Sequence, residues 1–461
     1  MFTERGRAVT NLLNTEQLPL LVVKYIRENN KQELEALLQE LQPYDIANLY
    51  EELPQKFKTR FLHYLDHALL ADVIQLLESY EMQYEILTKL PPGKKSDVLN
   101  EMDNDDLASL LHELPPEKSA PLLAAMKREE SDIVQNIMQY PEETAGRLMT
   151  NRFVWIRTYY TVQEAIEKLK SFAEYAENIN YLYVIDENRK LVGVVSYRDL
   201  LLADGNEIIK NIMYERVIAV SAYTDQEEAA MLLERYDFLA LPVVDENQVL
   251  LGIITFDDML NVIIKEANED IEKLSATGKA IDFDTKPLVA AWRRLPWLVS
   301  LLIIGIISGG IISFFESTLD RVVALSFFMP MITAMTGNIG TQSLSIVVRG
   351  LVGRKLDKRE IWRLVLREFA VGLITGVVCG IVISLIAYIW QGNFILGIVV
   401  GVSLFIALII GSLSGTVIPL LLYKLDVDPA VASGPLITTL NDIFSLVCYF
   451  SIATIFLQYI L

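Results

Sequence analysis

The last stretch of the 461-residue sequence, 433–461, holds a single charged residue, Asp442. Its surroundings, SGPLITTLNDIFSLVCYFSIATIFLQYIL, are typical of a membrane-spanning helix. A carboxylate near the centre of a membrane costs roughly 2.5 to 3.5 kcal/mol on insertion scales. Because the other apolar stretches contain no Lys, Arg or His, a proton or a permeating cation must balance Asp442. Asn441, Thr438 and Thr439 add oxygen atoms beside it, which favours a hard cation.

A second polar group lies in FFMPMITAMTGNIGTQSLSIVVRG (327–350), an otherwise apolar stretch that contains Asn338, Thr341 and Gln342. Polar residues at membrane depth are tolerated where they are buried in protein or line water. The alternative is a polar contact that joins two helices. Because this polar segment coincides with an acid in the final stretch, we expect the two stretches to line an ion path.

Uncharged stretches long enough to cross a membrane fill much of the second half of the chain. Residues 295–315, 322–348 and 369–423 carry no charge, and about 20 such residues suffice for one helical crossing. The run 369–423 is too long for a single crossing, and WQGN at 390–393 supplies a turn with an interfacial Trp. With the final stretch, the sequence predicts five membrane spans.

Small residues within these spans predict close helix packing. Gly305 and Gly309, and likewise Gly376 and Gly380, are four residues apart, a spacing that lets membrane helices approach one another. The two cysteines also lie inside apolar spans, where packing is a more common role than a disulfide or a metal site.

Basic residues set the expected orientation. Arg293 and Arg294 precede the first span, and RGLVGRKLDKREIWRLVLR (349–367) separates the second span from the third. Positively charged loops stay in the cytoplasm. The opening residues also lack the apolar core of a cleavable signal peptide. We therefore expect a multi-pass protein of the plasma (inner) membrane, surrounded by lipid, with its N-terminus in the cytoplasm and its C-terminus outside.

The acidic charge of the chain belongs to its first part. The formal net charge is −19, and of 40 basic and 59 acidic residues only 11 and 8 lie from Ala290 onward, so residues 1–289 carry −22. Phosphate binding needs the opposite sign, which argues against a nucleic-acid partner. The simplest interpretation of such acidity is solubility, and binding of divalent cations is the alternative.

Two internal repeats organise residues 15–263. The first predicts stacked helical hairpins over residues 15–140, where DIANLYEELP from Asp45 recurs as DLASLLHELP from Asp106.

The second repeat aligns LYVIDENRKLVGVVSYRDLL (182–201) with LPVVDENQVLLGIITFDDML (241–260) at an offset of 59. Each copy has two apolar strands around an Asp-Glu-Asn turn, followed by a helix start. This segment resembles a tandem pair of CBS domains, βαββα modules that often bind adenosine nucleotides.

An acidic helix connects this pair to the first span. Its pattern starts near Asp257 and places Glu266, Glu269 and Asp270 on one helical face. An ordinary helix face exposed to solvent would show the same pattern of acids, and Lys265 and Lys273 favour that interpretation in part. A rod between a sensor-like module and the membrane is nevertheless where a gate would be operated.

Taken together, the chain resembles the MgtE family of magnesium channels over nearly its whole length. The motifs are PEETAGRLMT (141–150), TDQEEAAMLLERYDFLALPVVDE, FDDMLNVIIKEANEDIEKL, TGNIGTQS and GPLITTLND. The resemblance implies a multidomain membrane protein with four parts. These are an acidic, all-α superhelical N-terminal domain (1–140), an α/β tandem CBS pair (141–263), a connecting or plug helix (264–289) and a five-helix transmembrane pore domain (290–461). It also implies a homodimer with its pore on the two-fold axis.

The resemblance also assigns site residues. The pore residues would be Asp442, Asn338 and Thr341, where TGNIGTQ departs from the usual GGNxGNQ and Gly434 replaces an Asn, so we expect looser selectivity. ATP would bind at Tyr181, Arg198 and Asp199. Regulatory Mg²⁺ would be held by Asp105, Asp225, Glu227, Asp237, Asp258, Glu266, Glu269 and Asp270.

The expected function is a Mg²⁺-selective channel for uptake that cytoplasmic Mg²⁺ closes. Divalent ions between carboxylates would remove the repulsion between the acidic parts of a dimer and favour a compact, closed state. Two other functions stay open, a proton- or gradient-coupled divalent cation transporter and a magnesium sensor without transport. An intramembrane metalloprotease is excluded and no enzyme is expected, because the three histidines, His63, His67 and His112, all precede the spans.

Overall fold

The computed structural model describes residues 17–77, 79–173, 175–277, 281, 285–351, 356–425 and 427–460. Residues 1–16 of the expected N-terminal domain, and 278–280 and 282–284 of the expected connector, lie outside the described residues. The chain divides into two compact units, Met1–Val262 and Ile263–Leu461.

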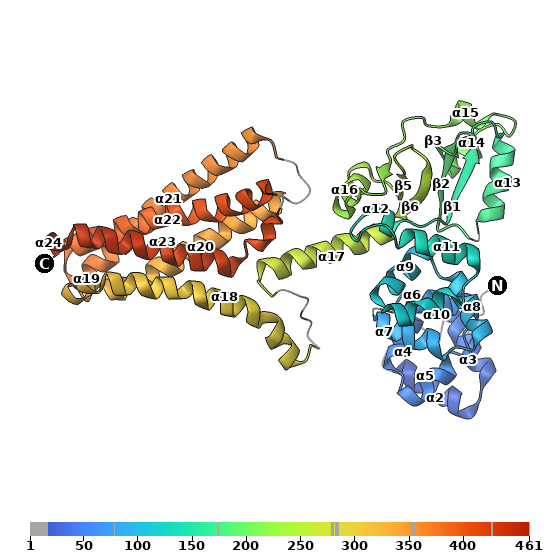
Figure 1. Cartoon of the computed structure of the whole chain (residues 1–461), viewed down its shortest axis with the longest axis horizontal. Helices are drawn as coiled ribbons and strands as arrows, with labels where there is room; N and C mark the ends of the chain where they lie inside the picture. The colour runs from blue at the N-terminus through green and yellow to red at the C-terminus, as the bar shows by residue number, and fades with distance from the viewer. Residues whose placement is uncertain are drawn as a thin grey trace. The chain divides into compact units, whose positions relative to one another are not determined.

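The first unit begins with a stack of short helices (Figure 1). They are α2 (Leu18–Glu28), α3 (Lys31–Glu40), α4 (Pro43–Glu52), α5 (Gln55–Phe61), α6 (His67–Gln75), α7 (Tyr80–Lys89), α8 (Pro92–Glu101), α9 (Asn104–Glu113), α10 (Pro116–Leu123) and α11 (Arg128–Ile137). The predicted repeat is confirmed, because its two copies form α4 and α9 with the same positions buried. Ile46 and Leu49 of the first copy match Leu107 and Leu110 of the second, and all four side chains lie in one core.

The CBS pair is also confirmed, and its two halves have the same topology. In each half a parallel strand pair is extended by an antiparallel strand, in the orders β1-β2-β3 and β4-β5-β6. The elements are α12 (Ala145–Leu148), β1 (Phe153–Arg157), α13 (Val162–Phe172), β2 (Asn178–Ile185), β3 (Leu191–Ser196), α14 (Tyr197–Leu202), α15 (Ile209–Ile212), β4 (Val220–Ser221), α16 (Gln226–Tyr236), β5 (Ala240–Val244), β6 (Leu250–Thr255) and α17 (Phe256–Leu274).

Local chemistry explains why the two copies fold alike. Asp186 Oδ1 accepts hydrogen bonds from the backbone N–H groups of Asn188 and Lys190 at 2.8 and 2.9 Å, which closes the turn between β2 and β3. Asp245 Oδ1 makes the same pair of bonds in the second copy, each at 2.8 Å. The acidic helix α17 follows β6 directly and buries Met259.

The second unit is a helical bundle. Its elements are α18 (Pro287–Phe314), α19 (Glu316–Arg321), α20 (Leu325–Leu351), α21 (Lys358–Gln391), α22 (Phe394–Lys424), η2 (Pro429–Val431), α23 (Gly434–Ile455) and α24 (Leu457–Ile460). The predicted break near residue 392 is confirmed, because Gly392 ends α21 with a left-handed backbone (φ 66°).

Four helices of the described chain are long and apolar enough to cross a membrane, namely α18, α21, α22 and α23. The fifth predicted span corresponds to α20, which has 27 residues but is not among the four. Its polar residues, Asn338, Thr341 and Gln342, lower its mean hydropathy. In Figure 1, α20, α22 and α23 run side by side, and α20 is one continuous helix.

The glycine rows behave differently in different helices. A Cβ at Gly380 would lie 2.8 Å from Gly401 O, and a Cβ at Gly401 would lie 2.6 Å from Gly380 O, so α21 and α22 pack backbone to backbone. The expectation for Gly305 and Gly309 is not met within this chain, because no described atom lies within 4 Å of a Cβ placed at either residue.

Candidate ion path and acidic clusters

The side chain of Asp442 faces a cavity in the second unit. The residue is half-buried, and its carboxylate makes no hydrogen bond or ion pair with any described residue. The cavity has a volume of about 580 Å³. It is lined by Leu298, Leu301, Leu302, Gly305, Ile306 and Ser308 of α18 and by Thr439 and Asp442 of α23. Six waters occupy about 180 Å³ as liquid, so the cavity can hold a hexahydrated ion beside the carboxylate.

Asn441 does not join this site. It is fully buried, its Nδ2 donates to Thr336 O at 3.2 Å, and its Oδ1 accepts a hydrogen bond from Ser414 Oγ. Both ends of its amide therefore join α23 to α20 and α22. The sequence interpretation of Asn441 as a ligand beside Asp442 is wrong, because neighbouring residues on a helix point about 100° apart.

Close packing at Gly340 fixes how α20 lies against its neighbours. A Cβ at Gly340 would lie 2.1 Å from Asn441 Nδ2, and a Cβ at Gly415 would lie 2.1 Å from Gly340 O. A side chain at Gly415 would meet the backbone of α20 and force a helix to move, whereas one at Gly340 would displace the Asn441 amide. Asn338 is exposed and Thr341 is half-buried, and neither lines the cavity beside Asp442. Their assignment to the ion path stays a prediction.

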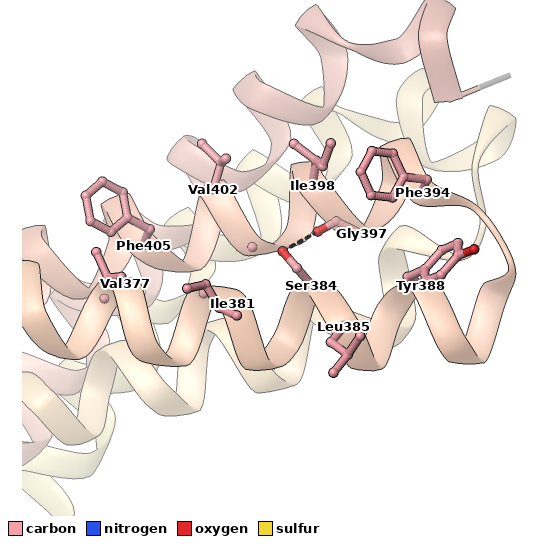
Figure 2. Close-up of a pocket in the computed structure, with 13 residues that line it drawn as sticks. Val377, Ile381, Ser384, Leu385, Tyr388, Phe394, Gly397, Ile398, Val402 and Phe405 are labelled. Atoms are coloured by element: carbon pink, nitrogen blue, oxygen red, sulfur yellow. Dashed lines mark hydrogen bonds between the residues drawn. The ribbon is translucent and has the colours of Figure 1, made fainter.

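A second hollow in this unit has a different character. A groove of about 520 Å³ lies between α21 and α22. Figure 2 shows the side chains that line it, among them Val377, Ile381, Ile398 and Phe405. Its lining is apolar apart from Ser384 and Tyr388, and Ser384 Oγ donates to Gly397 O at 2.8 Å. Without a charged lining residue, this groove is not an ion site.

In the first unit the predicted ligands Asp105 and Asp258 lie in one acidic cluster. Asp105 is 7 % exposed, and its Oδ1 has no hydrogen-bond partner among the described residues. Burial, together with Asp106, Glu177 and Asp258, raises the pKa of Asp105 well above its usual value. Burial is also the largest cause that raises the pKa of Asp258 to about 6.

Glu177 belongs to the same cluster, and the sequence interpretation missed it. Its carboxylate accepts a hydrogen bond from Thr150 Oγ1, and its pKa is raised to about 8, first by desolvation of the carboxyl group and then by Asp103. The residue lies 72 positions from Asp105, and no motif in the sequence predicts that the two meet. Only the packing of the helical stack against the CBS pair brings the two together.

A second acidic cluster lies at the end of α17, within the second unit. Lys273 Nζ lies 3.0 Å from Glu269 Oε1 and 2.7 Å from Asp428 Oδ2, so one ammonium group bridges α17 and the segment before α23. Burial, followed by Asp428, raises the pKa of Asp270. Partial burial alone would lower the pKa of Lys273, but its ion pairs with Asp428 and Glu269 outweigh this effect and raise it. Asp428 is a second acid that sequence reasoning missed.

The other predicted cation ligands do not converge within this chain. Asp225 caps the start of α16 by accepting from Glu227 N at 2.8 Å, whereas Asp237 lies beyond the opposite end of the same 11-residue helix. Glu266 lies one turn before Asp270 on α17. Across the described ranges, no three His, Cys, Asp or Glu side chains have a geometry that could hold one metal ion.

The predicted nucleotide residues come together at one end of the first CBS sheet. Tyr181 of β2 pairs with Ser196 of β3, and Arg198 and Asp199 follow in the first turn of α14. Asp199 Oδ2 accepts from Ser196 Oγ at 2.6 Å, which forms a capping box at the start of α14. Arg198 and Asp199 are exposed, so a ligand can reach both.

This fold and site define a multi-pass membrane protein with a helical stack and a tandem CBS module. The family described as MgtE, divalent cation transporter, matches residues 329–452, the MgtE intracellular N domain matches 41–143, and the CBS domain matches 145–206 and 209–265. Magnesium transporter MgtE of Bacillus subtilis is 54% identical over 443 residues, 96% of this chain and 98% of that protein. The chain belongs to the MgtE family, which is named for transport rather than catalysis.

Other similar proteins cover the whole chain or its first unit. Magnesium transporter MgtE of Thermus thermophilus is 38% identical over 451 residues, 96% of this chain and 99% of that protein. A crystal structure of the cytosolic domain of the Mg²⁺ channel MgtE in complex with ATP is 38% identical, with a TM-score of 0.50. It covers 53% of this chain and 99% of its own.

Proposed function

We propose that this protein is a channel that carries Mg²⁺ into the cell. The observation that supports it most is the unpaired carboxylate of Asp442, which faces a cavity large enough for a hydrated ion. Mg²⁺ gives up its water slowly, so Asp442 would accept hydrogen bonds from waters of the hydrated ion. The names of the relatives, magnesium transporter, agree with this cargo.

The proposed channel is a homodimer with five spans per chain, in which α20 is the additional span. A helix with exposed Asn338 and half-buried Thr341 is acceptable at membrane depth if this face lines water rather than lipid. The basic segment before α21 would lie in the cytoplasm with the N-terminus, and the C-terminus would lie outside. Asn338, Thr341 and Asp442 would then line one path on the two-fold axis.

Mg²⁺ in the cytoplasm would close this path through the acidic clusters. Asp105, Asp258 and Glu177 crowd charge in the first unit, and Glu269, Asp270 and Asp428 do so in the second. Glu266, Asp225, Glu227 and Asp237 would complete sites shared with the partner subunit. Divalent cations that bind more tightly to the compact state would shift the equilibrium toward it and close the channel.

ATP is the proposed nucleotide ligand of the CBS pair. The similar cytosolic-domain structure of the Mg²⁺ channel MgtE is a complex with ATP, which supports the same ligand here. Tyr181 would stack on the base, Arg198 would pair with phosphate and Asp199 would accept from the ribose, as their chemistry allows.

The decisive experiment measures Mg²⁺ uptake into liposomes that contain only the purified protein, with internal Mg²⁺ varied. We expect fast uptake that internal Mg²⁺ suppresses and that a proton gradient does not change. Asp442→Ala should reduce uptake to the level of protein-free liposomes. The matched control is Asp320→Ala, because Asp320 is an exposed acid of the same unit on α19, outside the cavity.

The same measurement distinguishes a channel from a coupled transporter and from a sensor without transport. Uptake that follows the proton gradient would identify a coupled transporter, in which Asp442 carries the proton. No uptake by the unaltered protein would leave only the sensor. Full uptake by Asp442→Ala would remove Asp442 from the path.

A further inference from the structure

Glu368 of α21 carries a buried carboxylate in the second unit that the ion path described above does not use. Glu368 is 2 % exposed and immediately precedes the apolar part of α21. Its Oε2 accepts from Ser343 Oγ at 2.8 Å. Its Oε1 accepts from Arg367 Nε at 3.1 Å and from Arg367 Nη2 at 2.8 Å. A buried charge persists only where its hydrogen bonds are satisfied, and here each oxygen has a donor.

These contacts join three helices at one point. Ser343 belongs to α20, Glu368 to α21 and Ser412 to α22. Ser412 Oγ donates to Glu368 O at 2.9 Å and lies 3.1 Å from Ser343 Oγ. Both serines are at most 2 % exposed. One turn further along α21, a Cβ at Gly372 would lie 3.2 Å from Ser412 Cβ, so the backbones are too close for the helices to slide freely.

The position of Ser343 on α20 makes this contact relevant to the ion path. Two residues along a helix are about 200° apart around its axis, so Ser343 faces nearly opposite to Thr341. The exposure agrees, because Ser343 is buried while Thr341 is half-buried and Asn338 is exposed. The hydrogen bond from Ser343 to Glu368 holds the buried side of α20. It therefore fixes the direction in which the opposite side, with Asn338 and Thr341, faces.

We propose that Glu368 is a positioning residue for the ion path: through Ser343 and Ser412 it sets the rotation of α20 and hence where Asn338 and Thr341 stand. The inference rests on the proposed function for its effect on transport. An ion recognised with its water shell is sensitive to the placement of each polar group, so rotating α20 changes selectivity as well as rate.

The variants are Glu368→Ala, Glu368→Gln and Ser343→Ala. The amide oxygen of Gln can still accept from Ser343, so Glu368→Gln should retain most wild-type behaviour. Ser343→Ala keeps the carboxylate and its pairing with Arg367, which makes it the milder test if Glu368→Ala folds poorly. Ser384→Ala is the matched control, because Ser384 Oγ donates to Gly397 O at 2.8 Å and joins α21 to α22 without touching α20.

Two measurements on the full-length protein test the proposal. The first is uptake of Mg²⁺ and Mn²⁺ into liposomes, where we expect Glu368→Ala and Ser343→Ala to change the Mg²⁺/Mn²⁺ rate ratio and the half-saturating Mg²⁺ concentration by about tenfold. The second needs no transport. It is the rate at which a water-soluble thiol reagent labels Asn338→Cys in a background without Cys379 and Cys448, and this rate should change several-fold with Glu368→Ala.

The possible results of the uptake and labelling measurements lead to different conclusions. Wild-type ratios and labelling rates in Glu368→Ala and Ser343→Ala, with only a lower unfolding temperature, would overturn the proposal. An equal change of ratio in Ser384→Ala would also overturn it, because any loosened helix pair would then suffice. No uptake by the unaltered protein together with altered labelling would refute the proposed transport while leaving the control of α20 by Glu368 in place.

Discussion

Two carboxylates on the long helices of the second unit, Asp442 on α23 and Glu368 on α21, have opposite environments. Asp442 is half-buried beside a cavity and has no partner among the described residues, whereas Glu368 is 2 % exposed and accepts hydrogen bonds at both oxygens. An unpaired charge must be balanced by something that comes and goes. A paired charge can stabilise one arrangement of helices. The pairing of an acid, rather than its depth, therefore distinguishes an ion ligand from an architectural residue.

The largest expected effect tests this contrast through stability. Glu368→Ala removes the carboxylate that accepts from buried Ser343, whereas Ser412 keeps the backbone oxygen of residue 368, and the loss should cost about 1 to 3 kcal/mol. Asp442→Asn removes an unpaired charge, so the free energy of unfolding should stay level or increase. Thermal unfolding of both purified variants in one detergent measures the difference. If Asp442→Asn destabilises the protein as much as Glu368→Ala, Asp442 has a structural partner and the contrast fails.

The next effect concerns Lys273, whose ammonium group takes the place of a cation between Glu269 and Asp428. Its side chain is 33 % exposed, so the pairing is worth about 1 kcal/mol, or roughly fivefold in an equilibrium. Lys273→Met should leave these acids to repel one another, which makes uptake without internal Mg²⁺ severalfold faster while saturating Mg²⁺ still suppresses it.

Uptake into liposomes at zero and saturating internal Mg²⁺ tests this prediction. Lys265→Met is the matched control, because Lys265 is exposed on the same helix and has no ion pair with a described residue. Equal responses of the two variants would mean that net charge alone, and not the bridge at Lys273, controls uptake.

A smaller effect should appear in how the stability of the first unit depends on pH. The folded pKa values of Asp258 and Glu177 are raised to about 6 and about 8, mainly by burial. Because raised pKa values favour the protonated acids in the folded state, their contribution to stability is complete at low pH and is lost as pH rises from about 6 to 8. Without divalent cations, amides of α9 should therefore exchange faster at pH 8 than at pH 6 after correction for intrinsic rates.

Added Mg²⁺ should remove most of this difference, since it replaces protons as the counter-charge. Helix α4 provides an internal control, because it is the repeat copy of α9 and its own acid, Asp45, is not in the cluster. An equal pH response in α4 and α9 would contradict a role for the cluster.

The smallest effect concerns nucleotide binding and compares the two CBS copies. At the offset of 59, Arg198 and Asp199 correspond to Asp257 and Asp258. The helix start after the last strand therefore has an arginine that could bind phosphate in one copy and two acids in the other. Arg198→Ala should weaken ATP binding by roughly fivefold, as expected for an exposed charge pair of about 1 kcal/mol. Calorimetry with ATP measures this, and Lys170→Ala on α13 should bind ATP like the unaltered protein. Unchanged affinity in Arg198→Ala would place the nucleotide elsewhere.

Local sequence patterns were sufficient to predict which elements form. Helical periodicity and recurring phrases predicted α4 and α9, and the Asp-Glu-Asn turns predicted the strand pairs of both CBS copies, because these features depend on residues close together in the chain. The apolar runs predicted five spans, and four helices of the described chain are long and apolar enough to cross a membrane; the acid in the last of them, Asp442, was evident from the sequence.

Which side chains meet depends instead on how the helices pack. Asn441 and Asp442 are adjacent in sequence, yet one packs between helices and the other faces a cavity, because successive helical residues point about 100° apart. Lys273 with Asp428, and Glu368 with Ser343 and Ser412, join segments far apart in the chain. Such contacts depend on how helices rotate and pack, which no local pattern encodes.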